Sequence, residues 1–486
     1  MSIVPRRAAP AARLAAVAAL AAAAGASAPV AALRPAHGRM PVPAAAVAAP
    51  PGPCRAAPRD APADFDGDGA SDLAAGAPYA AVRGRVRAGA VAVRTASGVT
   101  WLSRDAAARR GDGFGAALAT GDFDGDGCDD LAVGVPDQVD GARRAGADGD
   151  GAVQVFAGSP SGLRPGPGPV LTVRSLLRRR GTARSLVGGR PPTPPGTARF
   201  GASLVAADLD HDRDDELVVG APGLDGGGGV AVFGLRGRGL RPGPLVTQRT
   251  GWVDQSAAAT DGFGTVLAAG DFDGDGRDEI ATGAPGDGAR GAGTVTVLDP
   301  LERSANYVSQ DEPDVDGTAE RADGFGSALA AADFDGDGRD DLAIGAPGED
   351  RAGSAAYAEG AVQVLAGPGM RQLGPTRTGA GRYDRLGSAL AAGDLTGDGV
   401  PDLAAGSPGD GTVRVFPGKG RARTITSPFG RYSRFGDALA VRGRTLLVGA
   451  PGAHGFAGAV LSLPGPYAAA RPLPFAPRGL TGYALG

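Results

Sequence analysis

The sequence predicts an all-β chain that folds as a seven-bladed β-propeller of four-stranded blades. A G-x-P element recurs seven times at intervals of about 60 residues. An F-G or L-G pair precedes six of the seven, and short apolar runs bounded by Gly, Pro and Asp fill each interval, which is typical of strands. The G-x-P elements begin at Gly76, Gly134, Gly220, Gly283, Gly345, Gly406 and Gly449.

Each repeat supplies four candidate strands. The F-G pair opens the first strand, the run that ends in G-x-P is the second, and a run such as residues 360–365 is the third. A weaker run, such as residues 99–102 or 169–173, is the fourth. Four strands in each of seven repeats fit the blades of a propeller.

The two ends of the chain complement each other. The first repeat lacks its opening strand, whereas residues 482–485 at the end of the chain match the opening of other repeats, such as residues 387–390. We therefore expect the C-terminal strand to pair with the N-terminal blade and close the ring, which removes two exposed strand edges.

The N-terminal region predicts export. Residues 1–26 combine early arginines with an apolar, Ala-rich run and an A-x-A site, which is the pattern of a signal peptide; an alternative site would place cleavage as late as residue 32. Residues 27–60 form an Ala/Pro-rich segment that we expect to be a disordered linker, and residues 61–486 form the propeller. No later apolar run reaches the length of a membrane span, so we expect a secreted, extracellular protein.

Six of the seven repeats carry an acidic loop of the form D-x-D-x-D-G-x-x-D/E between their first two strands. The side chains at positions 1, 3, 5 and 9 and the carbonyl at position 7 can surround one hard cation, and such oxygen cages suit Ca²⁺. The sequence therefore predicts up to six calcium ions. The candidate ligands are Asp64, Asp66, Asp68, Ala70 and Asp72; Asp122, Asp124, Asp126, Cys128 and Asp130; Asp208, Asp210, Asp212, Asp214 and Glu216; Asp271, Asp273, Asp275, Arg277 and Glu279; Asp333, Asp335, Asp337, Arg339 and Asp341; and Asp394, Thr396, Asp398, Val400 and Asp402.

Three loops depart from the pattern. In the third, His211 and Arg213 replace the two loop glycines, so its ion is in doubt, and in the sixth, Thr396 replaces a carboxylate. The seventh repeat has a short turn without acids between Leu439 and Leu446. We infer that calcium stiffens this corner of six repeats and does not define the fold.

The F-G pairs, the D-x-D-x-D-G loops and the G-A-P elements, in this order, resemble the FG-GAP repeats of the integrin α-subunit propeller. The resemblance covers residues 63–486. It implies a seven-bladed propeller with Ca²⁺ loops on the lower face and partner contacts on the upper face. It also implies a stand-alone form like that of many secreted bacterial proteins, without the segments that follow the propeller in integrins.

Two other features have open interpretations. Cys54 and Cys128 would fit one disulfide in an oxidising compartment, or they are unrelated thiols. The insertion at residues 174–199 contains seven arginines and no acid, and we expect an exposed loop or linker. Within it, Arg178, Arg179 and Arg180 could capture an acidic partner, or the segment is simply solvated.

These observations favour a binding or adhesion module for an extracellular protein or glycan, which we expect to be a monomer. The alternatives are a secreted hydrolase or polysaccharide lyase built on the propeller, and a structural surface protein. The net charge of −4 provides no basic field for nucleic acid, and three histidines leave little room for His-based catalysis. We assign no catalytic residue, and we expect the partner on the face away from the calcium loops, where the variable loops open.

Overall fold

A computed structural model describes residues 54, 63–104, 107–138, 150–165, 170–179, 198–235, 239–350, 357–465, 470–473 and 482–485. The chain divides into two compact units, Met1–Pro50 and Pro51–Gly486, and every described residue lies in the second. The expected signal peptide lies outside the described residues, and so does the expected linker apart from Cys54.

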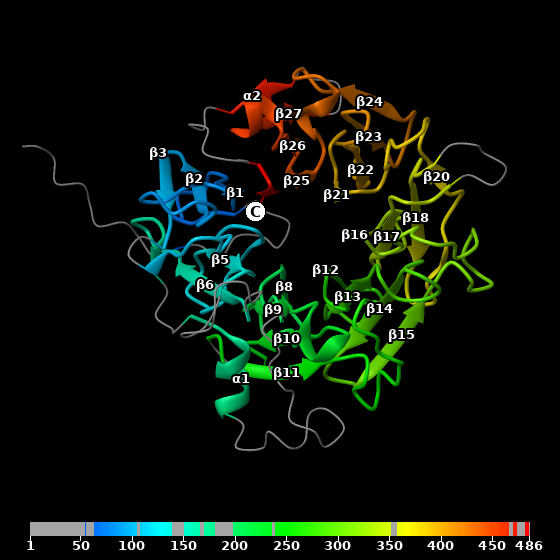
Figure 1. The fold of residues 1–486 in the computed structure, drawn as a ribbon, viewed down its shortest axis with the longest axis horizontal. Coiled ribbons are helices and arrows are strands. Elements are labelled where there is room, and N and C mark those ends of the chain that lie inside the picture. Colours follow the sequence, from blue (N-terminus) through cyan, green and yellow to red (C-terminus); the bar gives the residue numbers. More distant parts are fainter. Residues whose placement is uncertain are drawn as a thin grey trace, which may run out of the picture. The chain divides into compact units, whose positions relative to one another are not determined.

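The second unit contains seven antiparallel sheets that succeed one another along the chain, and they confirm the predicted seven-bladed propeller (Figure 1). In blade 1 the order is β29 (Ala484–Leu485), β1 (Leu73–Ala77), β2 (Ala90–Thr95) and β3 (Gly98–Leu102). Blade 2 contains β4 (Leu118–Gly121), β5 (Asp130–Val135), β6 (Ala152–Ala157) and β7 (Arg164–Pro165).

Blades 3 to 5 repeat this order from the innermost strand outward. Blade 3 contains β8 (Ser203–Ala207), β9 (Glu216–Gly220), β10 (Val230–Phe233) and β11 (Pro242–Val246). Blade 4 contains β12 (Val266–Gly270), β13 (Glu279–Ala284), β14 (Thr294–Asp299) and β15 (Ser304–Val308). Blade 5 contains β16 (Ala328–Ala332), β17 (Asp341–Ala346) and β18 (Ala361–Ala366), with β19 (Arg371–Gln372) and β20 (Arg377–Thr378) both paired to β18.

The last two blades complete the ring. Blade 6 contains β21 (Leu390–Gly393), β22 (Asp402–Ser407), β23 (Thr412–Phe416) and β24 (Arg423–Thr426). Blade 7 contains β25 (Ala438–Arg442), β26 (Thr445–Gly449), β27 (Val460–Pro464) and β28 (Arg471–Pro472). In Figure 1 the strands β8, β12, β16, β21 and β25 lie on the inner side of their blades.

The ring closes as the sequence predicts. β29 pairs with β1 in antiparallel register, with Ala75 opposite Leu485 and Gly76 opposite Ala484. The last strand of the chain is therefore the innermost strand of the first blade, and each blade has a neighbour on both sides.

The glycines of the G-x-P and F-G elements meet between adjacent blades. A Cβ atom at Gly283 would lie 2.1 Å from the carbonyl oxygen of Gly326 in the next blade, and one at Gly449 would lie 2.0 Å from that of Gly482. Because no side chain fits at such distances, the recurring glycines are explained by close packing of neighbouring blades.

The hydrophobic core is divided among the blade interfaces. Between blades 2 and 3, for example, the rings of Phe200 and Phe233 pack edge to face at 6.1 Å within a cluster that also contains Leu217. The Phe of the F-G pair is fully buried at Phe114, Phe200 and Phe263. Each blade therefore buries its apolar faces against its neighbours.

Two expectations about blade 2 and its insertion are wrong. The fourth strand is β7 at Arg164–Pro165, and in the predicted strand at residues 169–173 Leu171 makes an isolated bridge with Val153. The insertion does not begin as a loop, because α1 (Val173–Arg179) covers its first residues and Leu176 is buried against the core. Arg178 and Arg179 belong to this helix, and Arg180 lies outside the described residues.

The helical content is otherwise small. The described residues include the short helix α2 (Ala453–Phe456) and the 3₁₀ turns η2 (Leu224–Gly226) and η3 (Arg431–Ser433). Within the described residues, no helix has the length and hydropathy that crossing a membrane would require.

Candidate metal-binding loops

The six acidic loops all lead into the second strand of a blade. In blades 2 to 6 they connect the innermost strand to the second, as between β4 and β5, and in blade 1 the loop enters β1 directly. The candidate side chains of blades 1 to 6 are therefore placed at equivalent corners by the strand order of the propeller.

The first carboxylate of each loop organises the backbone around it. Oδ1 and Oδ2 of Asp122 accept hydrogen bonds from the N–H groups of Gly125 and Gly127, both at 2.8 Å. Asp271, Asp333 and Asp394 accept bonds from the equivalent glycines. The loop therefore wraps around its first side chain, as an ion cage requires.

The ninth position ties the end of the loop to its beginning. Asp72 accepts a hydrogen bond from the N–H of Phe65 at 2.9 Å, and Glu279 accepts one from Phe272 at the same distance. Phe65 and Phe272, at the second position of their loops, are buried and anchor these loops in the core. Thus the apolar residue inside the acidic motif sets the position of its ligands.

The carboxylates converge closely enough to share one cation. In each of the first four loops, one oxygen from each of three acidic residues lies within 4.8 Å of the others. Oδ1 of Asp72 and Oδ1 of Asp124 are buried and have no hydrogen-bond partner among the described residues. Oxygen atoms of this kind, without donors, fit coordination of a hard cation such as Ca²⁺.

The electrostatics of the loops also favour a cation. Burial, together with the charges of the neighbouring carboxylates Asp124 and Asp122, raises the pKa of Asp130 to about 8. Burial, followed by Asp273, raises the pKa of Glu279 to about 8. Acids that repel one another in this way are stabilised in their charged form by a bound positive ion.

The third loop keeps the path of the others despite its substitutions. His211 and Arg213 adopt φ angles of 61° and 79°, in the region that the loop glycines occupy elsewhere. Asp208, Asp210 and Asp212 still form one of the close carboxylate groups. The backbone geometry is therefore retained at a cost in strain, because non-glycine residues disfavour these angles.

The turn of blade 7 contributes positive charge in place of a loop. Arg444 donates a hydrogen bond from Nη2 to the carbonyl oxygen of Thr396 in the sixth loop at 2.6 Å. Arg442 is half-buried, and burial lowers its pKa to about 10 although Asp129 and Asp72 act in the opposite direction. The absence of acids from this turn is evident from the sequence, whereas the role of its arginines is not.

Sequence reasoning also missed the residue at position 8 of the loops. Asp129, Asp215, Asp278 and Asp340 each accept, on a side-chain oxygen, the backbone N–H of the first loop residue in the preceding blade, at 2.9–3.1 Å. In the same pairs the N–H of the position-8 residue donates to the carbonyl oxygen of that first residue. The consecutive acids at positions 8 and 9 were the available signal. Only the folded ring shows that the side chain at position 9 bonds within its own loop, whereas the side chain at position 8 bonds to the loop of the preceding blade.

The two cysteines are joined. Cys54 and Cys128 form a disulfide, which ties residue 54 to position 7 of the second loop. Cys54 also lies beside Gly67 of the first loop. The bond therefore fastens the segment that precedes blade 1 to the loops of blades 1 and 2.

Comparisons with known proteins identify the repeats. Residues 59–93, 114–156, 200–233, 263–298, 325–365 and 386–421 match the FG-GAP repeat. The chain is similar to integrin alpha-IIb of Mus musculus, with 34% identity over 256 residues that make up 46% of this chain and 23% of that protein. It is also similar to phosphatidylinositol-glycan-specific phospholipase D of Rattus norvegicus, with 34% identity over 186 residues, 36% of this chain and 21% of that protein.

These similarities are limited in extent. The chain spans about a quarter of the length of the integrin alpha-IIb relatives that it matches. Virginiamycin B lyase from Staphylococcus aureus superposes with a TM-score of 0.43 and 8% identity over 76% of this chain and 91% of that one, which is too low to support an inference. Residues 59–421 thus contain six FG-GAP repeats, and the chain is an FG-GAP repeat protein whose seven-bladed propeller resembles that of the integrin α subunits.

Proposed function

We propose that this protein is a secreted, calcium-binding propeller that acts as an extracellular binding module for a protein or glycan ligand. The convergence of three carboxylates within 4.8 Å in each of four equivalent loops is the observation that supports the metal site most directly. The similarity to integrin α subunits supports the binding role.

The chain's own residues suggest what calcium would do. The carboxylates at positions 1, 3, 5 and 9 would hold the ion, and calcium would supply the positive charge that these groups lack. Its effect would be structural, because each loop begins the second strand of its blade and the loops of blades 2 to 5 bond through position 8 to the preceding loop. A ligand that binds the folded protein alone stabilises it, by about 2.7 kcal/mol per site at a hundredfold excess over Kd.

Thermal unfolding tests the calcium proposal. Metal-free protein is melted with calcium, with magnesium and with a chelator, and calcium is expected to raise the melting temperature well above the other two conditions. Asp335→Ala in the fifth loop should reduce this increase, whereas Glu312→Ala, which removes an exposed acid outside the loops, should not. Equal melting temperatures in calcium and chelator would contradict the proposal.

Export is a separate part of the proposal. We propose that residues 1–26 are removed as a signal peptide and that residues 27–60 form a linker to the propeller. Expression of the full sequence followed by N-terminal sequencing of protein from the medium tests this. A mature N-terminus between residues 27 and 33 supports export, whereas retention of the intact chain in the cells contradicts it.

A further inference from the structure

A polar cavity of about 420 Å³ lies where blades 6, 7 and 1 meet. Its lining includes Arg385, Ser388, Arg434, Asp437 and Tyr483, which belong to the segments that lead into β21, β25 and β29. The sixth acidic loop follows the other end of β21. The cavity therefore opens at the end of the inner strands opposite to the loops.

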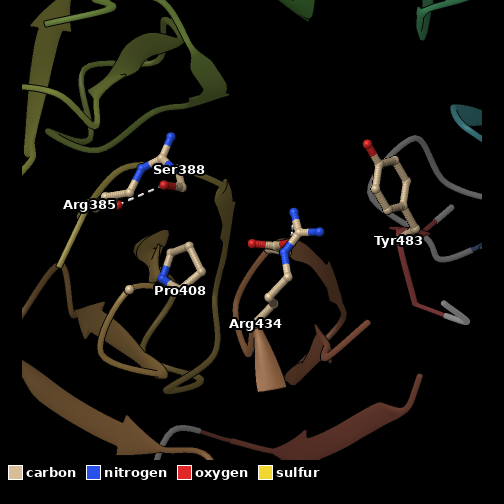
Figure 2. A pocket seen from close by; sticks show the side chains of 7 residues that line it. Arg385, Ser388, Pro408, Arg434 and Tyr483 are labelled. Atoms are coloured by element: carbon tan, nitrogen blue, oxygen red, sulfur yellow. Dashed lines mark hydrogen bonds and ion pairs between the residues drawn. The ribbon is translucent and has the colours of Figure 1, made fainter. Parts of the chain in front are cut away.

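The side chains of this cavity point the same way. In Figure 2 the guanidinium group of Arg434 lies between Arg385 and Tyr483, and the polar ends of all three side chains are directed to one side. Ser388 Oγ donates a hydrogen bond to the carbonyl oxygen of Arg385 at 2.8 Å, which keeps its hydroxyl beside the arginine. The arrangement presents two guanidinium groups and a phenol together.

Both arginines occupy a backbone position that favours glycine. Arg385 and Arg434 have φ angles of 58° and 54°, whereas the equivalent residues before the F-G pair in blades 4 and 5 are Gly262 and Gly324. A non-glycine residue at such an angle is disfavoured, and strain of this kind is often associated with function. The arginines therefore add charge at a cost that glycine would avoid.

The charges of the cavity are not balanced internally. Arg434 forms an ion pair with Asp437, whose side chain is 13% exposed. The guanidinium group of Arg385 forms no hydrogen bond or ion pair with any described residue. The lining consequently has one positive charge in excess, and the free donors of Arg385 can bind an anion.

Exposed tyrosines and an arginine lie close in sequence to the two arginines that line the cavity, or contact residues that do. Tyr383 and Tyr357 are 55% and 58% exposed, and the guanidinium carbon of Arg382 lies 5.2 and 4.9 Å from the centres of their rings. Tyr432, two residues before Arg434, is 84% exposed. Exposed tyrosine and arginine are the residue types that contribute most to protein–protein interfaces.

We propose that this cavity binds a carboxylate side chain of a partner protein, with Arg385 as its principal ligand and the neighbouring exposed tyrosines as further contacts. The proposal rests on the proposed function in taking the chain as a binding module. A carboxylate complements the excess positive charge and the planar donors of guanidinium. The exposed tyrosines and arginine near the cavity favour a protein as the partner, because both residue types are enriched at protein interfaces.

Arg385→Gly tests the proposal without damaging the fold. Glycine removes the guanidinium group and is the residue that blades 4 and 5 have at this position, so the melting temperature should be unchanged or higher. The matched control is Arg199→Gly, which makes the same exchange in blade 3, where Arg199 has a φ angle of 51° and lies outside this cavity. Arg385→Lys keeps the positive charge but removes the planar set of N–H donors of the guanidinium group.

The probe is a fluorescein-labelled tetraglutamate peptide, titrated with each calcium-loaded variant and followed by fluorescence anisotropy. We expect the parent and Arg199→Gly to bind with similar affinity, Arg385→Lys to bind more weakly, and Arg385→Gly to bind about tenfold more weakly or worse. Binding should also weaken as the salt concentration rises.

Several results would overturn the proposal: no binding at millimolar peptide, equal binding of a tetraglutamine peptide, or unchanged affinity in Arg385→Gly. Binding of oligogalacturonate but not of the peptide would also overturn it, in favour of a glycan. The experiments distinguish failure of the calcium proposal from failure of the cavity proposal. Calcium stabilisation without peptide binding contradicts the cavity alone, whereas Arg385-dependent binding without calcium stabilisation contradicts the calcium site alone.

Discussion

The backbone N–H of Asp122 donates a hydrogen bond to Oδ2 of Asp215 at 3.0 Å, although the two residues are 93 positions apart. In return, the N–H of Asp215 donates to the carbonyl oxygen of Asp122 at 3.0 Å. Asp122 is the first residue of the second acidic loop and Asp215 the eighth of the third. This pair of hydrogen bonds joins neighbouring loops. The same pair recurs at the next two blade interfaces and between blades 1 and 2.

Replacing Asp215 with alanine should weaken this connection. The variant leaves the N–H of Asp122 without its side-chain acceptor, so we expect the free energy of unfolding to fall by about 1–3 kcal/mol. Asp215→Asn keeps an oxygen that can accept the bond and should lose less. Chemical denaturation of both variants measures the difference.

The control is Ser71→Ala, which changes the same loop position in blade 1, where the preceding blade has no acidic loop. A loss of stability in Ser71→Ala as large as in Asp215→Ala would show that the effect is not specific to the contact between loops.

The glycine contacts between blades make a second prediction. Gly283→Ala places a Cβ atom against the carbonyl oxygen of Gly326, and the blades must separate to accept it. We expect a destabilisation of about 1–3 kcal/mol, as for other overpacked sites. Gly251→Ala serves as the control, since no atom lies within 4 Å of a Cβ atom there. Similar thermal melts for the two variants would contradict this explanation of the G-x-P element.

Ring closure predicts the effect of shortening the tail. Deleting residues 482–486 removes β29, so Ala75 and Gly76 of β1 lose their partners and a strand edge is exposed. We expect lower solubility and a broader, earlier thermal transition. Deleting Gly486 alone should have little effect. If the longer deletion melts like the intact protein, the β29–β1 pairing contributes nothing to closure.

Asp323 gives a prediction for pH. This residue precedes the F-G pair of blade 5 and is 2% exposed, and burial followed by the charges of Glu320 and Asp350 raises its pKa from 3.8 to about 6. Because the folded protein binds this proton more tightly than the unfolded chain, Asp323 makes folding less favourable as pH rises from about 4 to about 6. Above this interval, the free-energy cost of ionising Asp323 in the folded protein no longer changes with pH.

Asp323→Asn should therefore gain stability relative to the parent across this interval, since the amide oxygen can still accept the N–H of Glu320. Denaturation curves at pH 4, 5, 6 and 7 measure the difference, with Asp316→Asn at an exposed site as the control. A difference that is independent of pH would contradict the raised pKa of Asp323.

The sequence was sufficient for the number of blades, the closure of the ring and the positions of the acidic loops, because these follow from short motifs repeated in one order. It was insufficient for features that depend on contacts between residues of different blades. The role of Asp215 depends on a residue 93 positions away, and Arg385 and Arg434, which precede the L-G pair of blade 6 and the F-G pair of blade 7, line one cavity only in the folded ring. The helix α1 was missed because it has only seven residues, in which three apolar residues are mixed with three arginines.

Calcium stoichiometry tests the central claim most directly. Metal-free protein is dialysed against buffered free calcium up to millimolar concentration, and the bound metal is measured per chain. The account predicts five or six calcium ions per chain, with one fewer after alanine replaces Asp335 and Asp337 in the fifth loop. No bound calcium at millimolar concentration, or an unchanged number in the loop variant, would contradict it.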